Sequence, residues 1–109
     1  MARRVKWTEQ ALSDLSVVAD YIALDSPHYA AAFVREVRDA VRSLANFAER
    51  GRVVPEFANR NVRELFVRDY RLIYSLNQRD VYILAFIHGA RDLAQLWRRE
   101  DRHTPGCES

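Results

Sequence analysis

The sequence predicts an α+β fold in which a helical hairpin packs on one face of an antiparallel sheet, in the order β-α-α-β-β-β-(α). Two apolar stripes with the 3.6-residue period of a helix fill the chain between residues 9 and 50. Three runs of β-branched and aromatic residues, separated by polar turns, follow between residues 62 and 88. A helix with a single apolar stripe has to bury it against another layer, so we expect both helices to cover one face of the sheet.

The chain opens with a short predicted strand, Ala2 to Trp7, that leads directly into a first helix. Thr8 is a favourable N-cap residue, because its hydroxyl can accept a hydrogen bond from a backbone amide of the first turn. We predict a helix from about Glu9 to Leu24. Its apolar side chains lie mostly three or four residues apart, at Ala11, Leu12, Leu15, Val18, Ala19 and Ile22.

A second helix is predicted to begin at Ser26-Pro27, a hydroxyl N-cap followed by a proline in the first turn. Its apolar stripe consists of Ala30, Phe33, Val34, Val37, Val41, Leu44, Ala45 and Ala48. We expect this helix to end near Glu49-Arg50, because Gly51 can adopt a left-handed cap. The next segment, Arg52 to Asn61, contains Pro55 and is predicted to be a loop.

Three strands are predicted in the second half of the chain: Val62 to Val67, Tyr70 to Leu76 and Val81 to His88. The two-residue turn Arg68-Asp69 and the polar connection at residues 77–80 make neighbouring strands antiparallel. The last strand alternates between two apolar sets, namely Val81, Ile83, Ala85 and Ile87 against Tyr82, Leu84, Phe86 and His88. Because both of its faces are apolar, we expect this strand to be central.

The face of the sheet that the helical hairpin leaves free needs a cover of its own. Residues 91–100 are rich in helix formers and carry Leu93, Leu96 and Trp97 with helical spacing. We therefore predict a short C-terminal helix across part of this face. We expect the remainder of the face to bind a partner or a target.

The length of 109 residues allows one domain, which we place at residues 1–102 with a flexible tail at 103–109. The sequence contains neither a run of about 18 apolar residues nor a secretory leader, so we expect a cytoplasmic protein without a membrane span. The single cysteine, Cys107, excludes a disulfide framework and a cysteine-based zinc site within one chain. We expect neither a metal nor another cofactor.

Arginine dominates the charge of the chain, since 16 of the 17 basic residues are arginine and the formal net charge is +2. Arg60, Arg63, Arg68 and Arg71 fall within twelve residues. Guanidinium groups are planar and permanently charged, so this cluster suits the binding of carboxylate or phosphate and transfers protons poorly. The alternative is a solvated basic face with no binding role.

Five short motifs, in this order and spacing, resemble the RelE/ParE toxin superfamily: Trp7 to Leu15, Ser43 to Arg52, Arg63 to Val67, Tyr70 to Tyr74 and His88 to Asp92. The resemblance implies the toxin of a type II toxin–antitoxin system, with a role in growth inhibition and plasmid stabilization. ParE-like members act on DNA gyrase, and an acidic, partly disordered antitoxin neutralises them. RelE-like members instead cleave messenger RNA on the ribosome, and a non-toxic interaction domain is a third interpretation.

Residue matching favours the ParE-like activity, which requires no hydrolysis. When Tyr70-Arg71-Leu72 is aligned with the ribonuclease type, the two strand lysines of that type fall on Val62 and Glu64. Its terminal tyrosine falls on Trp97, whose indole does not titrate usefully. A metal-independent endoribonuclease would then depend on His88 as the general base. The alternative for His88 is a hydrogen-bonded turn residue at the end of a strand.

Under either activity, the residues expected to bind the target or nucleic acid are Arg63, Arg68, Arg71, Tyr74 and Arg91. Arg71 and Arg91 match arginines of the ribonuclease type. The alternative for each is a salt bridge, to Asp69 or to Asp92. Tyr74 is expected either to stack on a base or to be a half-buried residue of the sheet.

Overall fold

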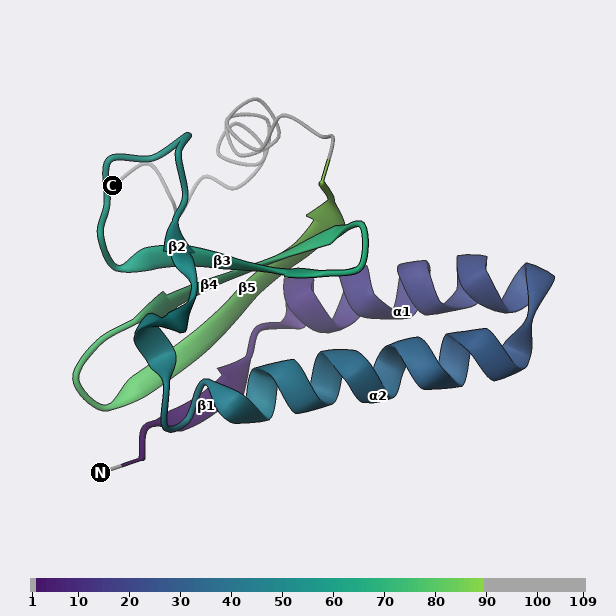
Figure 1. The fold of residues 1–109 in the computed structure, drawn as a ribbon, viewed down its shortest axis with the longest axis horizontal. Coiled ribbons are helices and arrows are strands. Elements are labelled where there is room, and N and C mark those ends of the chain that lie inside the picture. Colours follow the sequence, from purple (N-terminus) through teal and green to yellow (C-terminus); the bar gives the residue numbers. More distant parts are fainter. Residues whose placement is uncertain (1, 90–109) are drawn as a thin grey trace.

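The computed structural model describes residues 2–89 and confirms the predicted α+β fold (Figure 1). The elements are β1 (Arg4–Trp7), α1 (Glu9–Asp25), α2 (Pro27–Ser43), a 3₁₀ turn (Ala48–Arg50), β2 (Arg52–Val53), β3 (Val62–Val67), β4 (Tyr70–Leu76) and β5 (Asp80–His88). The two helices form an antiparallel hairpin that extends past the end of the sheet (Figure 1). Within residues 2–89, no helix is long and apolar enough to span a membrane.

The five strands form one sheet in the order β1-β5-β4-β3-β2. β5 is an interior strand as expected, although β4 lies at the centre. Three of the strand pairs are antiparallel, but β1 runs parallel to β5, with Arg4 opposite Asp80 and Trp7 opposite Ile83. The sheet is therefore mixed rather than wholly antiparallel. A parallel pair requires a long connection between its strands, and here the helical hairpin and the β2–β4 segment supply it.

The first turns of α1 are hydrogen bonded to β5 at the point where β1 ends. Thr8 caps α1, since its hydroxyl accepts a hydrogen bond from the amide of Ala11 at 3.1 Å. The same hydroxyl donates to the carbonyl oxygen of Ile83 at 2.7 Å. Six residues after Thr8, the Asp14 carboxylate accepts a hydrogen bond from the amide of Phe86 at 3.0 Å. Thr8 and Asp14 thus hydrogen bond to the edge of β5 at and beyond the point where its pairing with β1 ends.

β5 contains a β-bulge, which changes the faces predicted for its side chains. Ile73 lies opposite Ala85 and Tyr74 opposite Ile83, so Leu84 has no partner in β4. Beyond the bulge the alternation shifts by one residue. Phe86 therefore joins Val81 and Ile83 on the helix side, whereas Leu84, Ala85 and Ile87 lie on the other face. A strict two-residue period had placed Ala85, Phe86 and Ile87 on the wrong sides.

α2 ends at Ser43, well before the predicted end at Glu49-Arg50. Beyond this end, the Tyr74 hydroxyl holds the 3₁₀ turn, because it donates to the carbonyl of Ala48 at 2.7 Å and accepts from the amide of Gly51 at 3.0 Å. Gly51 is extended (φ −77°, ψ 157°), so it is not a left-handed cap. The segment predicted as a loop begins with β2, which pairs with β3.

The sheet has an apolar cluster on each face. The helix-side core combines α1, α2 and the sheet, and its fully buried members include Phe33, Val37, Leu44, Leu72 and Ile83. The second face carries Val54, Ile73, Ala85 and Ile87, with Phe57, Val62 and Leu84 packed against them. Val54 and Phe57 come from the β2–β3 connection, which covers part of this face. The predicted C-terminal helix at 91–100, Arg91, Trp97, Cys107 and the tail at 103–109 lie outside the described residues.

The close approach of three backbone segments at Gly51 leads to a prediction about stability. A Cβ atom at this position would lie 2.5 Å from the Tyr74 hydroxyl oxygen and 2.6 Å from the backbone oxygen of Glu64. We expect Gly51→Ala to lower the free energy of unfolding by about 1–3 kcal/mol, the usual effect of overpacking, as measured by urea denaturation.

Gly89→Ala is the matched comparison for this prediction. Its added Cβ would meet the ring of Phe66 at 3.0 Å and the backbone oxygen of Asp69 at 3.1 Å, and that ring is 55% exposed and can move. We expect a smaller loss of stability than for Gly51→Ala. Equal losses in the two variants would contradict the role assigned to the Gly51 contact.

Candidate functional site

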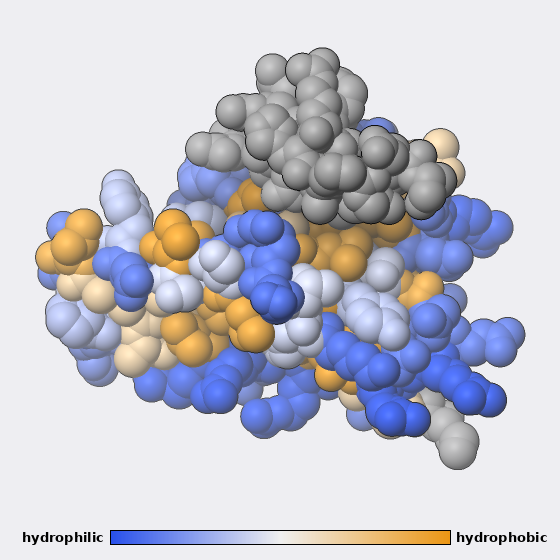
Figure 2. All heavy atoms as spheres, turned by 180° about the vertical axis from the view of Figure 1, so that it is seen from behind, coloured by the Kyte–Doolittle hydropathy of each residue, from blue (hydrophilic) through white to orange (hydrophobic). Residues whose placement is uncertain are grey.

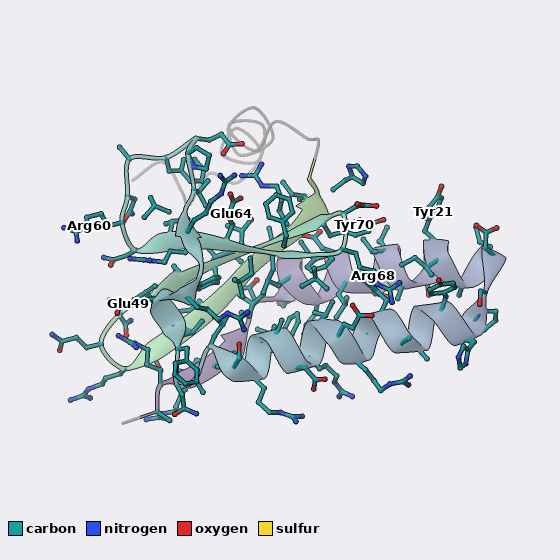
Figure 3. All side chains as sticks on the ribbon, viewed as in Figure 1. Tyr21, Glu49, Arg60, Glu64, Arg68 and Tyr70 are labelled. Carbon is teal, nitrogen blue, oxygen red and sulfur yellow. The ribbon has the colours of Figure 1, made fainter. Side chains whose placement is uncertain are left out.

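The four described residues of the predicted binding set do not form one surface. Arg71 lies on the second face of the sheet, where it meets two carboxylates. Arg63 and Tyr74 lie at the corner formed by the 3₁₀ turn and β2. Arg68 lies in the β3–β4 turn and reaches toward the helical hairpin (Figure 3). Each residue has its own environment, which decides what its side chain can bind.

Arg71 is buried, with its side chain only 5% exposed, and it is held by acidic residues from two segments. Its Nε donates to Glu64 Oε1 at 2.6 Å. Its Nη1 and Nη2 donate to the two carboxylate oxygens of Glu56, each at 2.9 Å. This geometry is bidentate, the strongest arrangement for a guanidinium and a carboxylate. The expected salt bridge of Arg71 to Asp69 is thus replaced by pairing with Glu64 and Glu56.

The carboxylate of Glu64 is completely buried and joins two arginines. It accepts hydrogen bonds from Arg71 through Oε1 and from Arg52 through Oε2. Arg52 lies on β2, Glu64 on β3 and Arg71 on β4, so this charged network crosses three strands. A phosphate approaching Arg71 would have to separate it from both carboxylates, and those carboxylates repel an anion.

The carboxylates also set the protonation state of Arg71. The hydrogen bond to Glu56 raises the pKa of the Arg71 guanidinium above its ordinary value, and the bond to Glu64 adds to this effect, while burial opposes it. The side chain therefore remains a cation at every physiological pH. It cannot act as a proton donor to a leaving group.

Tyr74 is a core residue rather than a stacking platform. Its side chain is fully buried, and its hydroxyl holds the Ala48 carbonyl and the Gly51 amide as described above. Burial raises the pKa of the Tyr74 hydroxyl above its ordinary value. Arg63 supports the same corner, because its Nη1 donates to the carbonyls of Glu49 and Gly51 at 3.1 and 3.0 Å. Both residues thus hold the backbone that joins α2 to β2.

Arg68 is the most exposed of the four, with 35% of its side chain accessible. Its φ of 56° at the first position of a two-residue turn is a conformation that glycine adopts most readily. The guanidinium pairs with Glu36 of α2 and lies 5.2 Å above the ring centre of Tyr29. The hydrogen bond from Arg68 lowers the pKa of the Glu36 carboxyl below its ordinary value. Arg68 thus joins the turn to the helical hairpin at the protein surface.

His88 is exposed at the end of β5 and contacts an aromatic row that begins in the core. The rings of Phe33, Phe86, Tyr70 and His88 follow one another with centroid separations of 5.5–5.6 Å. The edge-to-face contact with Tyr70 orients the imidazole. Among residues 2–89, no group of three or more His, Cys, Asp and Glu side chains could hold a metal ion.

Sequence reasoning did not predict an open groove between the helices, which we call the hairpin groove. It has a volume of about 640 Å³, and apolar side chains from β1, α1 and α2 line it: Val5, Trp7, Leu12, Leu15, Val34 and Val41. Two arginines of α2, Arg38 and Arg42, complete the lining. The helical period predicted that Leu12, Val34 and Val41 are core residues, yet Leu12 is 52% exposed. The sequence did indicate this groove, because the apolar stripes of the two helices are wider than burial against the sheet requires.

Further apolar side chains are exposed where the helical hairpin extends past the sheet. On the face seen in Figure 2, hydrophobic side chains gather among hydrophilic ones over the helical hairpin, at the left. Val17, Tyr21 and Leu24 of α1 are 66%, 68% and 83% exposed, and Tyr21 points away from the helical hairpin (Figure 3). With Leu12 of the hairpin groove, these residues place four exposed large apolar side chains on α1.

Comparisons with known proteins agree on one family. The family described as "ParE toxin of type II toxin-antitoxin system, parDE" matches residues 5–93. A relative named "Toxin RelE2", from Caulobacter vibrioides, is 37% identical over 89 residues, which is 81% of this chain and 97% of that protein.

Two solved structures are similar in fold. The first, titled "Chromosomal ParDE TA system from P. aeruginosa", has a TM-score of 0.66 and 24% sequence identity, and the match covers 80% of this chain and 96% of that one. The second, titled "Crystal structure of the E. coli DinJ-YafQ toxin-antitoxin complex", has a TM-score of 0.61 and 15% identity, covering 83% and 96% of the two chains. At these identities the matches show a common fold.

The buried network leads to a second prediction, in which Glu64→Gln is compared with Glu36→Gln. Both changes remove a carboxylate that pairs with an arginine, but the Glu64 side chain is 0% exposed and that of Glu36 is 47% exposed. Breaking a buried pair typically costs about 3–5 kcal/mol, and breaking an exposed pair costs far less. We expect urea denaturation to show that difference. Similar losses would mean that Arg71 does not depend on Glu64.

Proposed function

Because the chain belongs to the ParE toxin family of type II toxin–antitoxin systems, we propose that it arrests growth by binding DNA gyrase and that an acidic antitoxin neutralises it. A cytoplasmic location is part of this proposal, since gyrase acts on the chromosome there. The single observation that carries the choice of target is the burial of Arg71 between Glu64 and Glu56. That arrangement suits a binding protein better than a nuclease.

The charge around Arg71 is unfavourable for phosphate chemistry. A ribonuclease needs an accessible cation beside the scissile phosphate and a group that transfers protons. Here the cation is paired, and a carboxylate stands at the position where the ribonuclease type has a lysine. Tyr74 is buried and cannot stack on a base. These features support a toxin that binds its target without hydrolysis.

Arg68 is the described arginine that we assign to target binding. It lies at the surface on a tight turn, and its partner Glu36 is itself exposed, so an acidic surface can replace that partner at little cost. Arg91, which was also expected to bind the target, lies outside the described residues and remains part of the proposal. Arg63 and Tyr74 have structural roles at the 3₁₀ corner and are not needed as contacts.

Ribosome-dependent cleavage of messenger RNA is the second candidate, and His88 is the observation that favours it. The imidazole is exposed and is oriented by Tyr70, as a general base would be. The name of the Caulobacter relative also refers to RelE. In this mechanism His88 would take the proton of the 2′-hydroxyl group.

An antitoxin is the partner that the family and the fold support. The titles of both similar structures describe toxin–antitoxin assemblies. The exposed apolar side chains on the helical hairpin supply a surface for such a partner.

The third prediction separates the two targets by induction of the chain alone, with His88→Gln as the variant. If gyrase is the target, we expect DNA breaks and the DNA-damage response in both proteins, because glutamine keeps the size and hydrogen bonding of the imidazole. If the chain is a ribonuclease, losing the general base should lower transcript cleavage by about 100-fold or more. Cleaved transcripts on ribosomes, present with the wild type and absent with the variant, would refute the gyrase proposal.

The fourth prediction tests Arg68 with the change Arg68→Gly, which removes the charge and suits the φ of 56°. We expect growth arrest to weaken about tenfold or more, as for the loss of a charge-assisted contact, while the free energy of unfolding changes little. Arg35→Ala, at an exposed position of α2, is the control. Full toxicity of Arg68→Gly in a dose–response assay would remove Arg68 from the target contact.

A further inference from the structure

The start of the chain and the turn between β4 and β5 bring three arginines together at one end of the sheet (Figure 1). The Arg4 amide donates a hydrogen bond to the carbonyl oxygen of Arg79 at 2.9 Å. The Nε atom of Arg3 donates to the carbonyl oxygen of Asn77, in the same turn, at 2.7 Å. Arg4 and Arg79 are exposed, and Arg3 is half-buried. The backbones that carry three permanent cations are therefore adjacent.

The segment after α2 adds a fourth arginine and an exposed aromatic ring to the same end. The Arg3 amide donates to the carbonyl oxygen of Ala45 at 2.7 Å, which places this segment beside the start of β1. Two residues later, the Phe47 side chain is 67% exposed, while its backbone amide donates to Ser43 at 3.0 Å and its carbonyl accepts from Arg50 at 3.1 Å. Arg50 Nη1 also donates to the Ser43 hydroxyl at 2.7 Å. We call the surface formed by Arg3, Arg4, Phe47, Arg50 and Arg79 the basic end.

The arginines of the basic end have no carboxylate partners within the described part of the chain, residues 2–89. Three other arginines of the sheet and its turns each pair with a carboxylate: Arg52, Arg68 and Arg71. Asp80, which follows Arg79, pairs instead with Lys6 at 3.8 Å. Glu49, which precedes Arg50, is exposed. The chain thus neutralises its basic groups on other surfaces and leaves the guanidinium groups of the basic end available to an anionic ligand.

A nucleic acid with unpaired bases fits both features of the basic end. Guanidinium groups bind phosphate through parallel hydrogen bonds. An exposed aromatic ring on a fixed backbone is a platform for a base, and binding sites for single strands combine such rings with basic side chains. In a duplex the bases stack on one another and cannot reach Phe47. A lipid surface requires more buried apolar area than the one apolar side chain of the basic end supplies.

We propose that the basic end binds single-stranded nucleic acid, with a base stacked on Phe47 and the flanking phosphates held by the four arginines. This inference goes beyond the proposed function, because it concerns a different surface. Arg68, assigned to the target of the toxin, lies in the turn before β4, whereas the basic end includes the turn after β4. The phosphate contacts release counterions, so binding weakens as the salt concentration rises.

The fifth prediction is tested by fluorescence anisotropy with the full-length chain and fluorescein-labelled oligonucleotides of about 20 nucleotides. We expect oligothymidylate to bind more tightly than a duplex of the same length, because only the single strand offers a base to Phe47. A plot of log affinity against log salt concentration should have a slope of about −3, the value for four phosphate contacts on a single strand. Oligouridylate, measured in parallel, identifies whether DNA or RNA is the preferred single strand.

Two variants separate the stacking contact from the phosphate contacts. Phe47→Ala should weaken binding of the single strand by about 5- to 150-fold, the range for a lost base–aromatic stack, and leave the salt slope unchanged. Phe47→Trp should keep the affinity of the wild type. Arg79→Ala should make the slope shallower by about 0.7, the share of one phosphate contact. Arg35→Ala, an exposed change on α2 outside the basic end, should change neither quantity.

Three results would overturn the proposal. Tight binding of the duplex that equals binding of the single strand, with no effect of Phe47→Ala, would mean that no base stacks on the ring. An equal loss of slope in Arg35→Ala and Arg79→Ala would mean that the overall charge, rather than the basic end, attracts the strand. Binding to phosphatidylglycerol vesicles without binding to either single strand would identify a lipid surface as the ligand. Circular dichroism checks that each variant is folded.

Discussion

The arrangement of the whole domain depends on how α1 leaves the sheet. β1 pairs with only the first half of β5, and the exposed backbone groups beyond it are satisfied by Thr8 and Asp14 of α1. This contact fixes the start of α1 against β5. The helix-side core fills the space beneath the two helices, and the hairpin groove remains between them. One short strand and two polar side chains thus determine where the apolar surface of the helical hairpin lies.

On the second face of the sheet, the role of an arginine depends on the side chains that surround it. A cluster of arginines in the sequence suggests a surface for phosphate or acidic proteins. In the folded chain, Glu64 occupies the interior of that cluster and binds Arg52 and Arg71 together. Burying the Glu64 carboxylate costs desolvation free energy, and its hydrogen bonds to the two guanidinium groups offset that cost. Arg71, which was expected to bind a nucleic acid, therefore belongs to a network that connects three strands, whereas Arg68 of the same cluster is exposed in the β3–β4 turn.

Much of the fold followed from local patterns, whereas most site geometry did not. The sequence predicted the N-caps Thr8 and Ser26 and the three C-terminal strands correctly. Capping preference, strand propensity and hydrophobic period all depend on residues that are close together in the sequence. The bulge at Leu84 was missed, since an apolar strand gives no sign of an extra residue. The pairing of Arg71 with Glu56, 15 residues away in sequence, depends on how a loop returns over the sheet. Sequence spacing alone does not specify such a contact.

The parallel pairing of β1 with β5 has a consequence for the newborn polypeptide. Arg4 leaves the translation machinery first among the strand residues, but its neighbour in the sheet, Asp80, is synthesised near the end. Until then the helical hairpin has no complete layer to cover, and contacts between such distant residues form slowly. The nascent chain is therefore an unfinished domain during most of its synthesis. A binding partner that recognises the helical hairpin alone has an opportunity to engage it before the sheet closes.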